Sequence, residues 1–202
     1  MSREEVAREA ARLLYSRTVK EYKDAKEMAA ASLGSRALPS NYEVAVELDN
    51  MVEEREGSER LSMLLEMRET ALEVMKRLSD LDPVLIGSVW RGTPRMGSDV
   101  DIVVYSDDLD DVESRLLGYT VMKSEKKVFT VAGFPRTSTH LELEVGDHTV
   151  ELVVRPTRDR EFYVDERCET YGDIKKGIRR SELEKLIQSD PLRRFIPKRR
   201  NR

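Results

Sequence analysis

The sequence predicts an α+β fold, in which helices come first, a small mixed sheet follows and a short helix closes the chain. Three observations support this prediction. Apolar residues recur at helical spacing through the N-terminal part of the chain. From Pro83 onwards the pattern changes to short apolar runs and alternating segments, which are typical of strands. A capping pattern near the C-terminus predicts one more helix. Helices and strands therefore segregate along the chain, as in α+β proteins.

Three predicted helices fill the N-terminal region, residues 1–80. Each begins at a serine, and the first two begin with the Ser-x-x-Glu spacing of a capping box. Glycines mark the ends of these first two helices. The starting serines and closing glycines are Ser2 with Gly34, Ser40 with Gly57, and Ser58 for the third helix. These helices are expected either to form a substrate-side domain or to cover one face of the sheet.

Two short strands are expected next, on either side of a polar turn. Val84–Ile86 is an apolar run, and Asp101–Tyr105 is a second run that opens with an acidic residue. Both runs have the length of buried strands. Residues 110–117 then predict a short helix.

Alternating segments fill the rest of the sheet region. Residues 120–122 and 127–131 predict two strand segments, and residues 140–145 and 148–154 predict the arms of a hairpin. Gly146-Asp147 suits a two-residue turn with glycine first. The hairpin arms are therefore expected to be antiparallel neighbours in a twisted mixed sheet.

The C-terminal region, residues 161–202, is expected to hold a last helix and a basic tail. Ser181 and Glu184 have the spacing of a capping box and predict a helix over residues 181–188. From Arg193 to Arg202 there are six basic residues and no acidic one. Such a tail either neutralises phosphates or is simply a solvated terminus.

Composition excludes several classes of protein. Apolar residues make up 39% of the 202 residues, which is enough for a core. The single cysteine, Cys168, excludes an internal disulfide framework and a cysteine-based zinc site. The charged N-terminus shows no signal peptide, and no apolar run is long enough to span a membrane. We therefore expect a cytoplasmic protein with no membrane partner. The net charge of −4 does not by itself indicate nucleic-acid binding.

One segment carries the strongest chemical signal. Gly87-Ser88 follows the first strand, and Asp99-Val100-Asp101 opens the second strand after a spacer of ten residues. Small residues allow backbone N–H groups to approach a phosphate closely. Carboxylates at positions i and i+2 of a strand share one face, where they can bind the same divalent metal ion. A metal ion bridged to a triphosphate is the core of nucleotidyl transfer.

This segment resembles the nucleotidyltransferase superfamily that includes DNA polymerase beta. The family pattern is Gly-Gly or Gly-Ser, followed after a spacer of similar length by Asp-x-Asp or Asp-x-Glu. Arg91-Gly92-Thr93, inside the spacer, is most similar to archaeal CCA-adding enzymes and to aminoglycoside nucleotidyltransferases. The resemblance implies a polymerase-beta-like catalytic core over residues 81–160, with helices before it and after it.

The resemblance also implies an activity and a set of ligands. It implies transfer of a nucleoside monophosphate from a nucleoside triphosphate, with ATP as the expected donor, to an acceptor hydroxyl. Asp99 and Asp101 would hold one or two Mg²⁺ ions. The residues expected to bind the triphosphate are Gly87, Ser88, Arg91 and Thr93.

A third acid is expected from a neighbouring strand. In the family it comes from a strand that reads apolar-Asp-apolar-Val-Pro. The matching segment here is residues 150–156, in which Glu151 takes the place of the aspartate and Arg155 precedes the proline. Glu151 is therefore the expected third metal ligand and a candidate base for the acceptor hydroxyl. Glu142 and Glu144 on the preceding strand are the alternatives.

Other polar residues near the motif are expected to have structural or solvent-facing roles. His140 and His148 lack metal-ligand spacing with any other His or Cys, so we interpret them as structural or surface residues. Lysine clusters mostly lie on solvated faces, and this is the expectation for Lys123, Lys126 and Lys127.

The acceptor and the oligomeric state stay open. RNA is one candidate acceptor, as in CCA addition. A small molecule, as in aminoglycoside modification, and a protein side chain, as for antitoxin-like nucleotidyltransferases, are the others. A non-catalytic nucleotide- or RNA-binding scaffold of the same fold is the alternative from a different class. The presence of the whole Gly87-Ser88 and Asp99-x-Asp101 motif argues against that scaffold.

Overall fold

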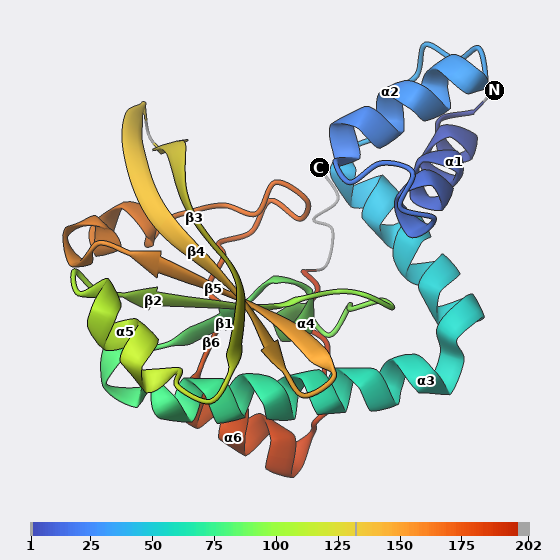
Figure 1. The fold of residues 1–202 in the computed structure, drawn as a ribbon. Helices are drawn as coiled ribbons and strands as arrows, with labels where there is room; N and C mark the ends of the chain where they lie inside the picture. The colour runs from blue at the N-terminus through green and yellow to red at the C-terminus, as the bar shows by residue number, and fades with distance from the viewer. Residues whose placement is uncertain (1, 132, 198–202) are drawn as a thin grey trace. The chain divides into compact units, whose positions relative to one another are not determined.

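The computed structural model describes residues 2–131 and 133–197, and the chain divides into two compact units. The helical unit takes in the chain up to Arg60 together with residues 167–173. The sheet unit takes in residues 61–166 and the chain from Ile174 onwards. Figure 1 shows the elements of both units along the chain.

The helical unit begins with two helices where the sequence predicts one. α1 (Arg3–Tyr15) and α2 (Tyr22–Ser32) replace the single helix predicted up to the first glycine. The break lies at Arg17, whose φ of 57° is in the left-handed region, where a right-handed helix cannot continue. The predicted capping box is present, since the Glu5 N–H donates to Ser2 Oγ over 3.1 Å.

α3 (Asn41–Arg77) joins the second and third predicted helices into one element. Gly57 interrupts it with φ 51° and ψ −126°, a conformation that glycine adopts easily. The predicted start is confirmed, because the Glu43 N–H donates to Ser40 Oγ and the Ser40 N–H donates to a Glu43 carboxylate oxygen at 2.7 Å. The break at the glycine is likewise where the sequence predicts it.

The core of the helical unit is small and rich in alanine, so its helices approach closely. Its buried residues are Val6, Ala7, Ala10, Ala11, Leu13, Leu14, Ala25, Ala29, Ala30, Val44, Leu48 and Val52. Ion pairs also join α1 to the first part of α3: Arg3 lies 2.8 Å from Glu43, and Arg8 lies 3.4 Å from Glu47.

The two compact units differ from the three predicted regions, 1–80, 81–160 and 161–202. The last part of α3, from Leu61 onwards, lies in the sheet unit. The reason is its apolar stripe, including Met67 and Met75, which is buried against the strands. The sequence pattern shows this stripe but not the surface that it covers.

Six strands form one mixed sheet in the described part of the chain, in the order β3–β4–β5–β2–β1–β6. The strands are β1 (Val84–Ile86), β2 (Val100–Tyr105), β3 (Thr120–Val131), β4 (Phe134–Val145), β5 (His148–Arg155) and β6 (Ile178–Arg179). Strands β2 and β5 are parallel, and the other neighbouring pairs are antiparallel. The predicted α+β class with a mixed sheet is confirmed.

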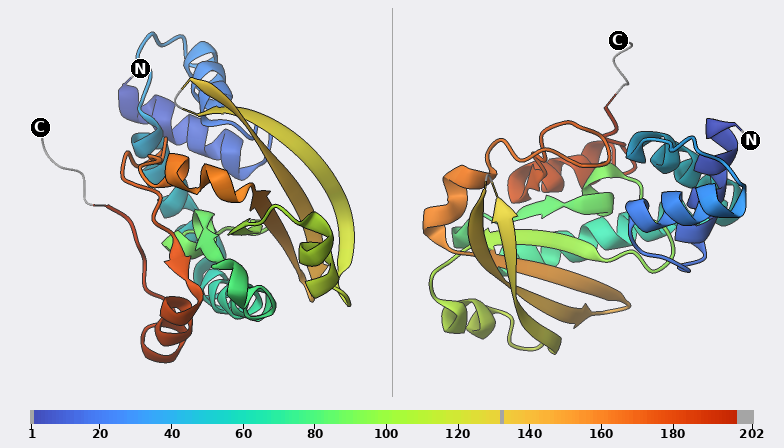
Figure 2. Two further views of the ribbon diagram at one scale, coloured as in Figure 1. Left: turned by 90° about the vertical axis from the view of Figure 1, so that its left-hand side faces the viewer. Right: turned by 90° about the horizontal axis from the view of Figure 1, so that it is seen from above.

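The hairpin prediction holds, and the strands before it are longer than predicted. Val145 pairs with His148, so Gly146-Asp147 forms the predicted two-residue turn. The two predicted segments at 120–122 and 127–131 are parts of the single long strand β3. Together β3 and β4 form a long, strongly curved hairpin (Figure 2).

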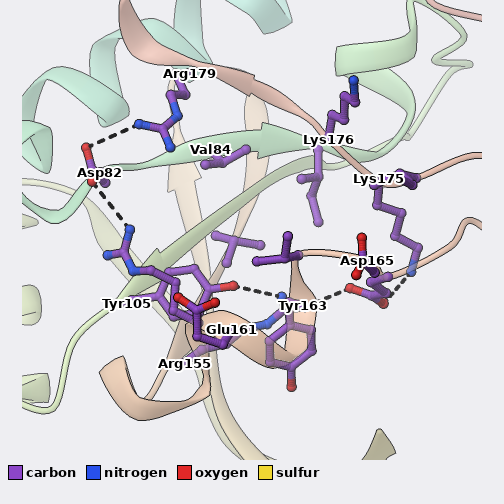
Figure 3. A pocket seen from close by; sticks show the side chains of 16 residues that line it. Asp82, Val84, Tyr105, Arg155, Glu161, Tyr163, Asp165, Lys175, Lys176 and Arg179 are labelled. Atoms are coloured by element: carbon purple, nitrogen blue, oxygen red, sulfur yellow. Dashed lines mark hydrogen bonds and ion pairs between the residues drawn. The ribbon is translucent and has the colours of Figure 1, made fainter. Parts of the chain in front are cut away.

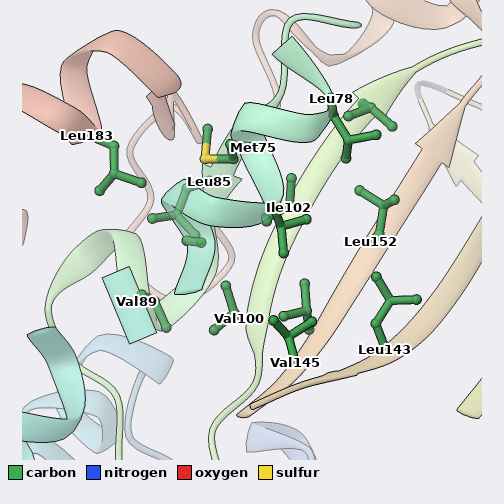
Figure 4. Packing of buried hydrophobic residues seen from close by; sticks show 14 of the residues in the cluster. Met75, Leu78, Leu85, Val89, Val100, Ile102, Leu143, Val145, Leu152 and Leu183 are labelled. Atoms are coloured by element: carbon green, nitrogen blue, oxygen red, sulfur yellow. The ribbon is translucent and has the colours of Figure 1, made fainter. Parts of the chain in front are cut away.

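One face of the sheet is covered by helices. The last part of α3, α5 (Leu109–Arg115) and α6 (Arg180–Ser189) share one apolar core with the strands (Figure 4). Strand residues such as Ile102 and Leu152 alternate into this core. The intervening residues point the other way, to what we call the site face. No helix in the described residues is both long enough and apolar enough to cross a membrane.

Candidate active site

Asp101 and Glu151 lie side by side on the site face. They are register partners in the parallel pair of β2 and β5, so neighbouring backbones hold the two carboxyl groups next to each other. The strand positions on either side of them, including Ile102 and Leu152, are buried in the core. The alternating direction of side chains along these two strands therefore fixes which of them reach the site.

The carboxyl of Asp101 resists ionisation. Burial is the main cause, and the negative charges of Glu151 and Asp99 add to it, with a hydrogen bond to Glu151; together they raise the pKa of Asp101 to about 8. Asp99 itself is exposed and lies just before β2. Without a compensating cation, Asp101 therefore holds a proton at neutral pH.

The pair suits a divalent cation in its chemistry. No three His, Cys, Asp or Glu side chains in the described residues are gathered closely enough to hold a metal ion as they stand. Asp101 and Glu151 nevertheless present adjacent oxygen ligands, the kind that Mg²⁺ prefers. A cation beside them would also offset the negative charge that raises the pKa of Asp101.

Gly87 brings the start of α4 (Gly87–Arg91) against this pair. Its φ is 70°, and a β-carbon placed on it would lie 2.0 Å from Oδ2 of Asp101. Ile86, just before it, is the antiparallel partner of Asp101, which explains the closeness. The absence of a side chain at this position is what allows the backbone and the carboxyl to share the space.

Ser88 and Thr93 close the turn that follows. The Thr93 N–H donates to the Ser88 carbonyl over 2.9 Å, and Gly92 between them has a φ of 74°. Ser88 lies next to Gly87 at the start of α4, and this backbone hydrogen bond holds Thr93 close to it. Their predicted role in triphosphate binding stays a prediction.

Arg91 is buried, and its predicted role in triphosphate binding stays a prediction. The residue is only 4% exposed, and its guanidinium donates to the Phe195 carbonyl over 3.0 Å. The Phe195 N–H in turn donates to the Arg91 carbonyl over 2.9 Å, and Trp90 stacks on the Phe195 ring. These contacts join Arg91 to the C-terminal segment.

His140 belongs to the site, although the sequence pattern does not reveal it. Its Nδ1 lies 2.6 Å from Oε1 of Glu151, and its Nε2 lies 3.0 Å from Oγ of the buried Ser138. Lys127 Nζ lies 3.5 Å from the same Glu151 oxygen. His140 is therefore a largely buried residue in contact with Glu151 and not a surface residue, whereas Lys127 contacts Glu151 and is also partly exposed to solvent.

These contacts keep Glu151 ionised. Burial alone would raise its pKa, but the hydrogen bond and charge of His140, with the charge of Lys127, outweigh burial and lower it. The signal for this contact lies in the hairpin turn. A two-residue turn after Val145 sets residue 142 opposite Glu151 and leaves His140 on the same face, one step along the strand.

The alternative acids lie further from Asp101. Glu142 pairs with Glu151 from β4, and Glu144 pairs with Thr149; both are exposed. His148 lies 3.7 Å from Glu66 with a half-buried side chain, and its interpretation as a structural or surface residue stays a prediction. Of the three glutamates, Glu151 is thus the one that pairs with Asp101 in the strand register.

The predicted basic tail is described only in part. Residues 198–202 lie outside the described residues. Arg193 contributes its backbone carbonyl to the interior, where Arg68 donates to it over 2.8 Å. A β-carbon on Gly92 would lie 3.0 Å from that same carbonyl, so the segment packs closely beneath the turn after α4.

Comparison with known proteins matches residues 68–187, more than half of the chain, to the nucleotidyltransferase domain family. A search among curated proteins gives no match. Among solved structures, the chain is similar to the GLD-2/RNP-8 complex, at 14% identity and a TM-score of 0.34 over 61% of this chain and 45% of that one.

Two further solved structures are similar to a comparable extent. A cytoplasmic RNA terminal U-transferase matches at 19% identity and a TM-score of 0.29, over 56% of this chain and 34% of that one. The Cid1 poly(U) polymerase with bound MgGTP matches at 18% identity and a TM-score of 0.27, over 55% and 36%. The chain spans less than half the length of each of these proteins.

Proposed function

The chain belongs to the nucleotidyltransferase domain family, and from that premise we propose a specific reaction. It transfers a nucleoside monophosphate from a nucleoside triphosphate, with ATP as the donor, to an RNA hydroxyl, in a reaction that needs Mg²⁺. The observation that carries this proposal is the Asp101–Glu151 pair, set in parallel register beside the backbone of Gly87.

Each site residue has a distinct role in this reaction. Asp101 and Glu151, with Asp99 next to them, would hold Mg²⁺. When bound, Mg²⁺ offsets the negative charge of the triphosphate and activates the attacking hydroxyl. Gly87 and Ser88 offer backbone N–H groups and a hydroxyl to the triphosphate at the start of α4. Glu151, ionised and oriented by His140, accepts the proton of the acceptor hydroxyl.

The experiment is incubation of the protein with each labelled nucleoside triphosphate and Mg²⁺, against total RNA, total protein and small-molecule acceptors. The expected result is label in RNA and release of pyrophosphate. Label in protein or in a small molecule would overturn the choice of RNA. No label in any fraction, with no Mg²⁺-dependent thermal shift by a triphosphate, would favour the non-catalytic scaffold.

A double variant tests the site directly. Asp99→Asn with Asp101→Asn should abolish transfer while the fold persists, because the ligand charges are lost without a change of shape. The matched control is Asp110→Asn with Glu113→Gln, which removes two exposed acids from α5. Full transfer by the first double variant would remove Asp99 and Asp101 from the mechanism.

A further inference from the structure

A pocket of about 530 Å³ opens on the site face, over the same two strands as the candidate active site, and Figure 3 shows the side chains that line it. Tyr105 and Arg155 line it, and they are register partners four residues beyond Asp101 and Glu151 on the same two strands. At ~3.3 Å per residue, they lie about 13 Å along the strands from that pair. Ile86, the cross-strand partner of Asp101, also lines the pocket, so its wall reaches the site.

Positive charge exceeds negative charge in the half-buried wall of the pocket. Glu166 is shared by two cations, with Lys175 Nζ at 2.7 Å and a guanidinium nitrogen of Arg155 at 3.8 Å. Each of these cations has only this one carboxylate partner within 4 Å in the described residues. The cluster therefore keeps one positive charge that is not neutralised.

The opposite wall repeats this arrangement. Asp82 is shared by Arg160 at 3.4 Å and Arg179 at 4.0 Å. Lys176 adds a further charge at the rim, where it makes no ion pair with any described residue. The other acidic lining residues, Glu161 and Asp165, are exposed. The inner surface of the pocket is thus suited to an anion.

Arg155 has hydrogen-bonding capacity in reserve. Its side chain is 15% exposed, yet its polar contacts with described residues are long, at 3.5 Å to the Tyr105 hydroxyl and 3.8 Å to Glu166. Arg68, also buried, donates instead to four carbonyls at 2.5–3.2 Å. The planar donor fork of arginine matches a phosphate, and here stacking on the Tyr163 ring holds it in place together with one long hydrogen bond.

Aromatic rings lie beside these cations. The Arg155 guanidinium stacks 3.5 Å from the centre of the Tyr163 ring, and Arg160 lies 4.7 Å from the Tyr105 ring. The two tyrosine rings are 6.5 Å apart and tilted by 54°. Tyrosine rings and arginine planes are the surfaces on which unpaired bases stack. A phosphate site and a stacking surface therefore share one pocket.

We propose that this pocket binds one nucleotide of a single-stranded RNA acceptor, upstream of the hydroxyl that is extended. Arg155 and Lys175 hold its phosphate, and Tyr105 with Tyr163 receives its base. The pocket lies on the same face as Asp101 and Glu151, and Ile86, the cross-strand partner of Asp101, lines it, so one RNA strand laid along β2 and β5 would reach both. The inference rests on the proposed function for the identity of the acceptor.

The test measures RNA binding without nucleotide transfer. A fluorescently labelled RNA of ten or so nucleotides is titrated with the full chain in EDTA, and its anisotropy gives the Kd at several salt concentrations. Lys175→Glu should weaken binding about tenfold, with a smaller salt dependence, because one of the two cations that hold the phosphate is lost. Lys185→Glu, the same charge change on an exposed residue of α6, should leave the Kd unchanged.

A second pair of variants tests stacking. Tyr163→Ala should weaken RNA binding about tenfold, whereas Tyr163→Phe, which keeps the ring, should bind as the original chain does. Thermal melts establish that each variant is folded.

The outcomes separate this inference from the proposed function. Equal RNA affinity for Lys175→Glu, Tyr163→Ala and the controls would overturn the pocket assignment, even if RNA is the acceptor. A rise in the KM for the triphosphate alone would assign the pocket to the donor instead. Transfer of label to a different acceptor, with no RNA binding, would overturn both proposals. RNA binding that depends on the pocket, with no nucleotide transfer, would support the pocket assignment and contradict the proposed transfer reaction.

Discussion

Gly87 shows how a single residue sets the geometry of the site. The backbone at this position has a φ of 70°, and a β-carbon would lie 2.0 Å from the Asp101 carboxyl. The backbone conformation and the close contact each disfavour a side chain at this position, for different reasons. A φ of this value strains the backbone of any residue that has a β-carbon. The Asp101 carboxyl already occupies the space that the β-carbon would need.

Gly87→Ala should therefore destabilise the fold and remove activity together. Strain and forced displacement each cost about 1–3 kcal/mol, so the unfolding free energy should fall by more than ~2 kcal/mol. Urea titration checks this. Gly146→Ala is the control, since its φ is 58° but nothing lies within 4 Å of the added carbon. Equal losses in the two variants would show that the contact with Asp101 has no effect.

His140 provides a second prediction at this scale. His140→Ala removes the group 2.6 Å from Glu151, so the carboxylate loses its orientation. Transfer activity should fall ~10–100-fold, the usual effect of losing a hydrogen bond to a ligating group, while the melting temperature changes little. His140→Asn, which retains a donor near the Nδ1 position, should recover part of the loss.

The other histidine supplies the control for this prediction. His148→Ala removes a side chain that lies near Glu66 and away from Glu151 in the strand register. Its transfer activity should match that of the original chain. Similar losses for the two histidine variants would mean that hairpin stability, and not the contact with Glu151, explains the effect.

At the scale of elements, Arg68 joins three segments of the sheet unit. It extends from α3 and donates to the Val89 and Trp90 carbonyls at the end of α4. It also donates to the carbonyls of Pro191 and Arg193 in the segment after α6. Burial lowers its pKa to about 10, which still leaves it charged at neutral pH. The short helix α4 owes part of its position to this contact.

Arg68→Met should cost ~3 kcal/mol or more, because each buried carbonyl left without a donor costs about 1–3 kcal/mol. Equilibrium unfolding in urea measures the change. The control is Arg77→Met, which removes another α3 arginine that donates to a backbone carbonyl, that of Leu117, but is 38% exposed. Comparable losses for both variants would contradict the special role of burial at Arg68.

The start of α3 should respond to acid. Burial opposes ionisation of Glu43, but the hydrogen bonds from Ser40 and the pairing with Arg3 outweigh it and lower its pKa below the ordinary value of 4.5. Because the pKa is lowered in the folded state, this contribution to stability is present above pH 4.5 and is lost as the pH falls through the folded pKa.

Glu43→Gln isolates that contribution. At neutral pH the variant should be less stable than the original chain, because the charge-assisted contacts are lost. The difference should shrink as the pH is lowered, when the glutamate of the original chain is itself protonated. Thermal melts followed by circular dichroism at several pH values measure it. A difference that is constant with pH would show that ionisation of Glu43 does not contribute.

At the scale of the whole molecule, most of the architecture follows from local patterns. Serine caps predict the starts of α1 and α3, Gly57 predicts the break inside α3, and alternation predicts the hairpin of β4 and β5. The last helix, α6, lies where it is predicted, but the predicted capping box of Ser181 with Glu184 is wrong, because the Arg179 N–H donates to Glu182 instead. The sequence does not predict the break at Arg17, because neither this residue nor its neighbours Ser16 and Thr18 are glycine or proline, the usual helix breakers. The sequence does not predict that the last part of α3 belongs to the sheet unit, because an apolar stripe does not show which surface it packs against.

The candidate site is predictable to the extent that it is contiguous in sequence. The Gly87-Ser88 and Asp99-x-Asp101 segment lies within one stretch, and Glu151 follows from the resemblance. His140 and Lys127 join the site only through strand pairing, so their roles depend on register. The pocket beyond Tyr105 depends on residues from four separate segments of the chain, and no local pattern indicates it.

The parallel pairing of β2 and β5 has a consequence for how the chain tolerates change. The separation of Asp101 and Glu151 is set by backbone hydrogen bonds between two strands and not by the residues that connect them. Loops and the outer part of the curved hairpin can therefore lengthen or shorten while the acids stay together. A single residue inserted inside β5 before Glu151 would instead turn that carboxyl into the apolar core. The chain is thus permissive of length variation between its acids and intolerant of it beside them.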